Sequence, residues 1–145
     1  MFFKTYCLVN LTSGKPPRGR PLIAALTDEP GVEVIESLFL RDDVEIVMNK
    51  LNLLEVYYDI YRRSGSMMAD EMLDEIGRSP IRIIPEMTDA VFKEAGRLKA
   101  IYRISLADAV ALAEASVTGG SLVTSDHHEF DPVQATEKIS FFWIR

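Results

Sequence analysis

Apolar positions along the chain alternate between short continuous runs and longer stretches with helical spacing. The short runs are rich in β-branched and aromatic side chains, and their apolar residues do not alternate strictly, as expected for strands covered on both faces. These predicted strands occupy residues 2–10, 44–48, 81–85, 121–124 and 139–144.

The stretches between these runs predict helices. In residues 51–63, for example, Leu51, Leu54, Tyr58 and Tyr61 form one helical stripe. The other predicted helices span residues 21–31 (a helix and turn), 32–40, 67–77, 88–102 and 105–118. Strands that alternate with helices predict an α/β fold: a three-layer sandwich around a mostly parallel sheet of about five strands. We expect one domain over residues 1–145, with residues 11–20 as an atypical loop rich in proline, glycine and basic residues.

Composition adds a prediction about where the protein works. No apolar run approaches the roughly 18 residues that a membrane span requires. The first residues lack the pattern of a signal peptide. Cys7 is the single cysteine, so no internal disulfide can form, which suits a reducing compartment. We therefore expect a cytoplasmic protein without a membrane segment.

Charge is unevenly distributed along the chain. The formal net charge is −6, but Lys4, Lys15, Arg18 and Arg20 are the only charged residues before Asp28. The rest of the chain is therefore strongly acidic. Such a body repels polyanions, so any nucleic-acid function requires a local basic patch or a bound cation.

Candidate chemistry lies where the parallel strands end, because ligands bind beyond the carboxyl ends of such strands. Asn10 follows the first predicted strand, residues 47–49 end the second, and Asp126 follows the fourth. Asp126 is thus the first acid that this rule selects.

Two further acids lie on predicted helices. Asp108 forms a capping box with Ser105, but its almost uncharged helix also predicts partial burial and hence a need for a partner. Glu55 lies beside the apolar stripe of residues 51–63, where it can pair with Arg62 or Arg63, point to water, or join a site. For each acid, these alternatives remain open.

Glu55, Asp108 and Asp126 together make a stronger case for a site. Carboxylates that converge at one strand edge repel one another and raise each other's pKa unless a cation lies between them. Mg²⁺ or Mn²⁺ suits such an oxygen-only site, and one or two of these ions can activate a water for attack on a phosphodiester.

Several segments resemble one known family. The segments NLLEVYYDIYRR, ISLADAVALAEA and SLVTSDHHEFDPV, with the terminal FFWIR, resemble PIN domains, especially the VapC-type toxins of toxin–antitoxin pairs. PLIAALTDEPG is similar to the first helix and turn of that family. The resemblance implies a parallel α/β sandwich and a cytoplasmic, Mg²⁺- or Mn²⁺-dependent ribonuclease that cleaves RNA. It also implies a homodimer and a small antitoxin partner that blocks the active site.

The resemblance also assigns roles to individual residues. Glu55 matches the family's helical glutamate, Asp108 its aspartate in the ADA block, and Asp126 its aspartate after the fourth strand. Thr124 matches a polar residue that supports the site. We assign no catalytic role to the nearby polar residues and interpret them as part of a surface turn: His127, His128 and Asp131.

The chain departs from the family at its first metal ligand. The family carries an aspartate in a D-T-S or D-T-N motif after the first strand, but alignment on PLIAAL leaves Arg18, Gly19 and Arg20 in that place. Pro16 and Pro17 would then fall in a central strand, from which proline is excluded. Residues 2–9 must therefore supply the strand, and Asn10 is nearest the ligand position as a neutral oxygen donor.

The basic loop has several interpretations. Lys15, Arg18 or Arg20 can contact RNA phosphates, can neutralise the three acids in place of a metal, or can lie in a solvated loop. A phosphate loop is disfavoured, because Val9 and Pro16 replace required residues of its motif.

The residues and the family resemblance together lead to two hypotheses about function. The first is a divalent-metal-dependent endoribonuclease of the toxin–antitoxin type. The second is a catalytically inactive PIN domain that serves as a binding or dimerisation module, or the product of a frameshifted gene. A phospho-acceptor receiver is disfavoured, because Glu86 follows the third strand and no lysine follows the fourth.

Overall fold

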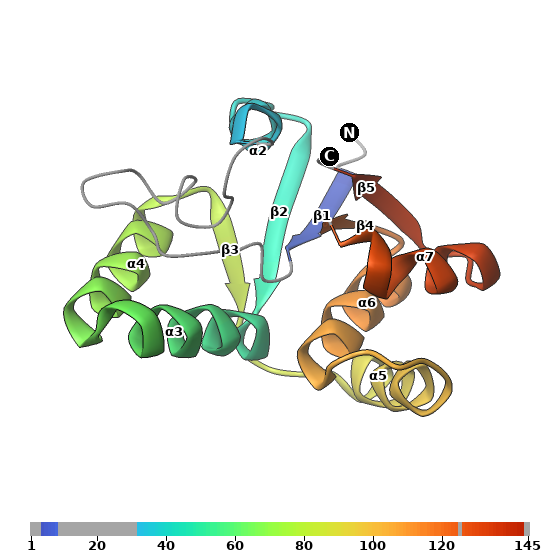
Figure 1. The fold of residues 1–145 in the computed structure, drawn as a ribbon. Coiled ribbons are helices and arrows are strands. Elements are labelled where there is room, and N and C mark those ends of the chain that lie inside the picture. Colours follow the sequence, from blue (N-terminus) through green and yellow to red (C-terminus); the bar gives the residue numbers. More distant parts are fainter. Residues whose placement is uncertain (1–3, 9–31, 125, 144–145) are drawn as a thin grey trace.

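A computed structural model describes residues 4–8, 32–124 and 126–143 of the chain (Figure 1). Its five strands form one sheet in the order β3-β2-β1-β4-β5, and every neighbouring pair is parallel. The strands are β1 (Lys4–Leu8), β2 (Val44–Asn49), β3 (Ile81–Ile84), β4 (Ser121–Thr124) and β5 (Ser140–Trp143). The predicted fold class and all five predicted strands are confirmed.

Strand β1 lies at the centre of the sheet. Its residue Cys7 pairs with Val47 of β2 on one side and with Leu122 of β4 on the other. The prediction that residues 2–9 supply this strand is therefore confirmed for residues 4–8. The predicted loop of residues 11–20 and the predicted helix of residues 21–31 lie outside the described residues.

Most of the predicted helices are also confirmed. Gly65 separates α3 from α4 with a φ of 88°, a backbone conformation that favours glycine, which explains why the break falls there. The described helices are α2 (Val32–Phe39), α3 (Lys50–Ser64), α4 (Ser66–Arg78), α5 (Asp89–Ile101), α6 (Leu106–Thr118) and α7 (His127–Thr136).

Helix α7 corrects one prediction. His127, His128 and Asp131 do not lie in a turn but in this helix. Pro132 lies inside α7. Because proline has no N–H to donate to the carbonyl of His128, the sequence disfavours a helix at this point. The helix forms nevertheless, because Asp126 caps its start and its apolar residues Phe130 and Val133 are buried.

The crossover connections place helices on both faces of the sheet. The connection from β2 to β3 runs through α3 and α4, and the connection from β3 to β4 runs back in the opposite direction through α5 and α6. Because such crossovers are right-handed, the two pairs of helices cover opposite faces. Figure 1 shows α3 packed with α4, and α5 packed with α6, as two separate pairs.

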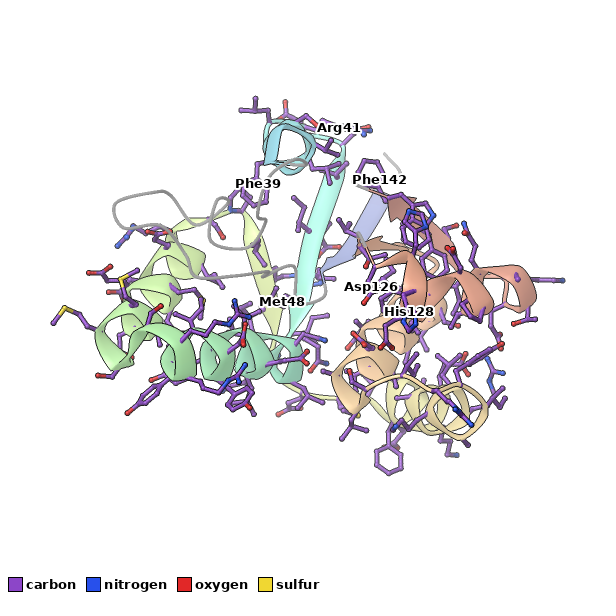
Figure 2. All side chains as sticks on the ribbon, in the orientation of Figure 1. Phe39, Arg41, Met48, Asp126, His128 and Phe142 are labelled. Atoms are coloured by element: carbon purple, nitrogen blue, oxygen red, sulfur yellow. The ribbon has the colours of Figure 1, made fainter. Side chains whose placement is uncertain are left out.

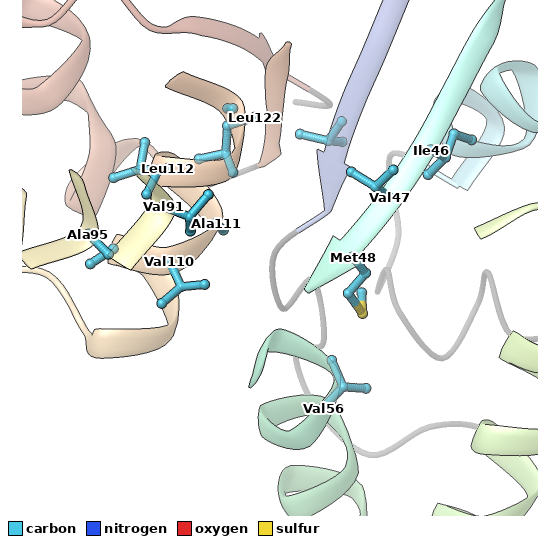
Figure 3. Packing of buried hydrophobic residues seen from close by; sticks show 14 of the residues in the cluster. Ile46, Val47, Met48, Val56, Val91, Ala95, Val110, Ala111, Leu112 and Leu122 are labelled. Atoms are coloured by element: carbon cyan, nitrogen blue, oxygen red, sulfur yellow. The ribbon is translucent and has the colours of Figure 1, made fainter. Parts of the chain in front are cut away.

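Helix α6 forms the centre of the core. Its small and apolar residues from Ala109 to Ala113 are buried, and they contact α5 and β4 (Figure 3). Ser105 caps the start of α6, and Gly119 ends it with a φ of 70°. Within the described ranges, no helix combines the length and the apolar character needed to cross a membrane.

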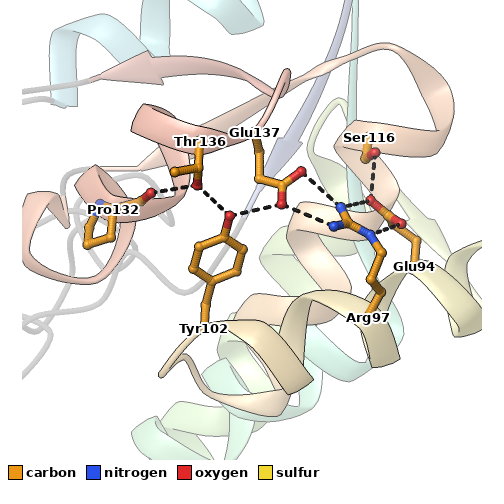
Figure 4. A network of polar contacts seen from close by, with 7 residues as sticks. All are labelled: Glu94, Arg97, Tyr102, Ser116, Pro132, Thr136 and Glu137. Carbon is orange, nitrogen blue, oxygen red and sulfur yellow. Dashed lines mark hydrogen bonds and ion pairs between the residues drawn. The ribbon is translucent and has the colours of Figure 1, made fainter.

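A polar network joins α5 to the end of α7 (Figure 4). Arg97 of α5 forms ion pairs with Glu94 on its own helix and with Glu137, which follows α7. The Tyr102 hydroxyl hydrogen-bonds both Thr136 and Glu137. This network fixes the position of α7 relative to α5.

The strand order also locates the site. Chain connections run from β1 toward β2 and β3, and from β4 toward β5, so the strand order reverses between β1 and β4. Ligands of such sheets bind outside the carboxyl ends of the strands at this switch point. Asp126, which follows β4, lies at this point.

Candidate active site

Asp126 is positioned by residues on both sides of it in the chain. Thr124 is almost fully buried, with 1% of its surface exposed, and its hydroxyl accepts a hydrogen bond from the Asp126 N–H at 3.1 Å. The Asp126 carboxylate in turn accepts from the Glu129 N–H at 3.0 Å, which caps α7. Asp126 is exposed at the start of this helix (Figure 2).

Asp108 combines both of the roles considered for it. The Ser105 hydroxyl accepts from the Asp108 N–H at 3.0 Å, and the Asp108 carboxylate hydrogen-bonds back to Ser105, so the capping interaction is confirmed. Burial raises the pKa of Asp108 to about 6 despite these hydrogen bonds, and the charges of Glu129 and Asp126 raise it further. Asp108 therefore caps α6, and burial together with the nearby acids destabilises its charged form.

Glu55 forms no ion pair with Arg62 or Arg63 in the described part of the chain. Both arginines pair instead with Asp59, one turn further along α3. Burial raises the pKa of Glu55, and the charges of Asp108 and Asp59 raise it further. Its Oε2 atom is buried and has no hydrogen-bond partner among the residues described. The structure thus favours a role for Glu55 in the acidic site over the ion pair.

Glu129 is a member of the site that the sequence analysis missed. It lies in the first turn of α7, and its charge raises the pKa of Asp108. Its Oε2 is also buried without a hydrogen-bond partner in the described ranges. The spacing Asp126-x-x-Glu129 is that of a capping box and would have indicated both the helix and this acid.

Asn52 is a second residue that the sequence analysis missed. Its side chain is fully buried, with no exposed surface, and its Nδ2 donates to the carbonyl of Ala107 at 2.8 Å. Ala107 precedes Asp108 on α6, and Asn52 lies one turn before Glu55 on α3. Asn52 therefore ties together the two helices that carry these acids.

Glu55, Asp126 and Glu129 each interact electrostatically with Asp108, so the four acids lie in the same region of the molecule. Within the described ranges, no three acidic, histidine or cysteine side chains group closely enough to hold one metal ion. The donor chemistry nevertheless fits Mg²⁺ or Mn²⁺, because the donors are all oxygens and two buried carboxylate oxygens have no hydrogen-bond donor among the residues described.

The remaining predicted site residues fall in segments that the structure does not describe. These are the candidate ligand Asn10 and the candidate RNA contacts Lys15, Arg18 and Arg20. Their predicted roles stay predictions.

An apolar cleft lies directly beside the acids. It has a volume of about 460 Å³ and is lined by residues of α3 and of the start of α6, including Glu55. Leu54, Tyr58 and Leu106 each expose more than half of their surface at this cleft. The acidic cluster therefore borders an exposed apolar surface.

Several solved structures share this fold. VapBC2 from Rickettsia felis bound to a promoter DNA fragment is similar with a TM-score of 0.67 and 16% identity, over 95% of this chain and 97% of that one. VapBC-1 from nontypeable Haemophilus influenzae has a TM-score of 0.67 and 13% identity, over 97% and 98% of the two chains. A toxin–antitoxin complex from Klebsiella pneumoniae has a TM-score of 0.50 and 16% identity, over 70% and 75%.

Sequence comparison identifies the family. A search of curated protein sequences finds no match. The PIN domain family model, however, matches residues 21–134, which is most of the chain and includes Glu55, Asp108, Asp126 and Glu129. The resemblance inferred from the sequence motifs is thereby confirmed, and the chain belongs to the PIN domain family.

Proposed function

We propose that this protein is a divalent-metal-dependent endoribonuclease of the toxin–antitoxin type. The observation that carries the proposal is the set of four acids that interact electrostatically around Asp108. Two of their buried carboxylate oxygens have no hydrogen-bond donor among the described residues. Four carboxylates in one cluster are stable only when protons or a cation offset their charge.

Glu55, Asp108 and Asp126 would hold Mg²⁺ or Mn²⁺, with Glu129 as an additional carboxylate and Asn10 as a neutral donor. The ion would supply the positive charge needed to activate a water and to stabilise the leaving oxygen of an RNA phosphodiester. Thr124 keeps Asp126 in place through the Asp126 N–H, and Asn52 keeps Glu55 close to Asp108.

A small antitoxin is the proposed protein partner, and a homodimer is the proposed assembly in the cytoplasm. The apolar cleft supports a protein partner, because Leu54, Tyr58 and Leu106 expose apolar surface beside the acids. The toxin–antitoxin structures with the same fold agree with this proposal.

Cleavage of single-stranded RNA by the purified protein tests the proposed activity. We expect cleavage in Mn²⁺ or Mg²⁺ that stops on addition of EDTA and falls at least about 100-fold in Asp108→Asn, since that variant loses a central charge. A thermal unfolding curve of Asp108→Asn verifies that the variant is folded. Cleavage that survives EDTA, or that is unchanged in the folded variant, rules out the proposal.

A catalytically inactive PIN domain is the second candidate function. Two observations favour it: the residue nearest the first ligand position is Asn10, and no three metal-binding side chains group together in the part of the chain that is described. In that case the purified protein cleaves no RNA in either metal but still binds its protein partner.

A further inference from the structure

A second cavity lies between the end of α5 and the first turns of α7, and Glu129 is part of its lining. It has a volume of about 300 Å³. Its lining residues are Ile101, Tyr102, Arg103, His128, Glu129 and Pro132. Two of these, Arg103 and His128, offer N–H donors, and neither was considered as a binding residue from the sequence.

Arg103 differs from most arginines in the described ranges, because none of the carboxylates described there forms an ion pair with it. It is exposed in the short connection between α5 and α6. Five other arginines there do pair with carboxylates: Arg41, Arg62, Arg63, Arg82 and Arg97. Among the described residues, no carboxylate therefore competes with a ligand for the five donors of the Arg103 guanidinium.

His128 contributes a second donor to the same cavity. It is exposed two residues after Asp126, and Figure 2 shows the two side chains near one another at the start of α7. A neutral imidazole donates one N–H in either tautomer, so this donor does not depend on protonation. The neighbouring His127 has a different environment, because it hydrogen-bonds Asp131 and stacks on Trp143 with ring centroids 3.9 Å apart.

The cavity adjoins the acidic site through a shared residue. Glu129 lines the cavity, and its charge also acts on Asp108. A phosphate bound in the cavity would therefore lie next to a phosphate bound at the acids. The acids and the net charge of −6 repel an RNA backbone, so RNA bound at the acids requires a positive charge close by.

We propose that Arg103 and His128 bind a backbone phosphate of the RNA substrate, adjacent to the phosphate held at the acidic cluster. Arg103 supplies the charge and a planar fork of donors that matches phosphate oxygens, and His128 supplies one hydrogen bond. This inference rests on the proposed ribonuclease function and adds a substrate subsite to it.

RNA binding by variants at this cavity tests the inference. The probe is a fluorescein-labelled single-stranded RNA, its anisotropy is measured in EDTA over a range of salt concentrations, and every protein carries Asp108→Asn so that no RNA is cut. We expect Arg103→Ala to raise Kd about five- to tenfold and to reduce the slope of log Kd against log salt by about 0.7, the value for one lost phosphate contact on a single strand. Arg103→Lys should keep the slope.

Arg78→Ala is the matched control. Arg78 is exposed in the last turn of α4 and likewise forms no ion pair with a described carboxylate, but it lies just before β3, at the opposite end of the strands from the acids. Its Kd and salt slope should equal those of the parent.

Cleavage kinetics separate this inference from the proposed function. In the background with Asp108 intact, Arg103→Ala and His128→Ala should raise KM for RNA while kcat changes less than about twofold, as expected for a binding contact. If the protein cleaves RNA but Arg103→Ala and Arg78→Ala have the same Kd, salt slope and KM, the subsite is wrong and the ribonuclease stands. If the protein neither binds nor cleaves RNA, both are wrong.

Discussion

Asp108 links the stability of the protein to pH. Its pKa is about 6 in the folded state, against 3.8 for the unperturbed group, because burial disfavours the charged form. Between about pH 4 and pH 6 the folded protein retains a proton that the unfolded chain has lost. The free energy of unfolding therefore decreases as pH rises through this range, and the full cost of the Asp108 charge is present at pH 7.

Asp108→Asn should consequently stabilise the metal-free protein at pH 7. The substitution removes the charge and keeps the shape, so we expect the free energy of unfolding to rise by about 1–3 kcal/mol at pH 7 and by little at pH 4. Urea unfolding in EDTA at the two pH values measures the difference. Asp74→Asn, at an exposed position on α4, is the control and should change neither value. An equal gain at both pH values would contradict the electrostatic explanation.

Individual site residues were predictable where their signal is local. Asp108 follows a capping serine at a fixed spacing, and Asp126 follows an apolar run that could only be a strand. Asn52 was not predictable, because its role depends on the carbonyl of Ala107, which is distant in sequence and adjacent only in the fold. Whether Glu55 pairs with Arg62 or Arg63 was left open by the sequence, because Asp59 lies one turn further along the same helix and only packing decides which acid the arginines contact.

At the scale of elements, the network in Figure 4 determines how firmly α7 is held. Arg97, Glu94 and Glu137 are partly exposed, so water and salt weaken their ion pairs. A double-mutant cycle with Arg97→Met and Glu137→Gln should give a coupling energy of about 0.5–1.5 kcal/mol in urea unfolding. The coupling should decrease in 1 M salt. A cycle that closes to zero at low salt would show that the pair does not anchor α7.

Two glycines provide a paired test of helix stability. Gly119 adopts a φ of 70° where α6 ends, whereas Gly96 lies inside α5, and an added Cβ would meet no atom within 4 Å at either position. The backbone alone therefore decides the result. We expect Gly119→Ala to lower the free energy of unfolding by about 1 kcal/mol and Gly96→Ala to raise it by about 0.5–1 kcal/mol. Thermal unfolding of the two variants should shift in opposite directions, and shifts of the same sign would refute this explanation.

Elements with their own periodicity were predicted with bounds within a few residues of those observed. Helix α7 was not, because its sequence HHEFDPVQAT has no clear apolar stripe and contains a proline. Its stability comes from the Asp126 cap, from the buried Phe130 and from the contacts of Glu137 with Arg97 and Tyr102. These contacts are mostly distant in sequence, so the pattern of the segment alone predicts a turn.

At the scale of the whole molecule, β1 connects two halves of the sheet. Its residue Tyr6 pairs with Ile46 of β2 and with Ser121 of β4, so β2 and β3 contact β4 and β5 through this strand. Tyr6→Pro should remove a backbone donor from the central strand and lower the free energy of unfolding by about 3 kcal/mol or more. Ser140→Pro, at the first residue of the edge strand β5, should cost much less. Urea unfolding of both variants measures the contrast, and equal losses would place β1 outside the cooperative core.

The overall architecture was predictable because alternation of strands and helices leaves few topologies. The exclusion of Pro16 and Pro17 from a central strand correctly assigned that strand to the residues before Asn10. The strand order was not predicted, because pairing between β1 and β4 depends on how segments more than a hundred residues apart pack together. That order is what brings Asp126 to the switch point.

The charge balance of the whole molecule predicts how Mn²⁺ binding affects the free energy of unfolding. If the four acids and Asn10 hold the metal as proposed, the neutral Asn10 in place of a further carboxylate should weaken Mn²⁺ binding, but the binding should still stabilise the fold. At a Mn²⁺ concentration 100 times Kd, we expect a gain of about 2.7 kcal/mol in the free energy of unfolding, seen as a higher unfolding temperature that EDTA reverses. Asp108→Asn should lose most of this gain, and Asp74→Asn should keep it. If Mn²⁺ has no effect on the parent protein, the charge of the four acids is neutralised within the chain itself, as expected if Lys15, Arg18 or Arg20 lies close to them. The protein is then a binding module rather than a nuclease.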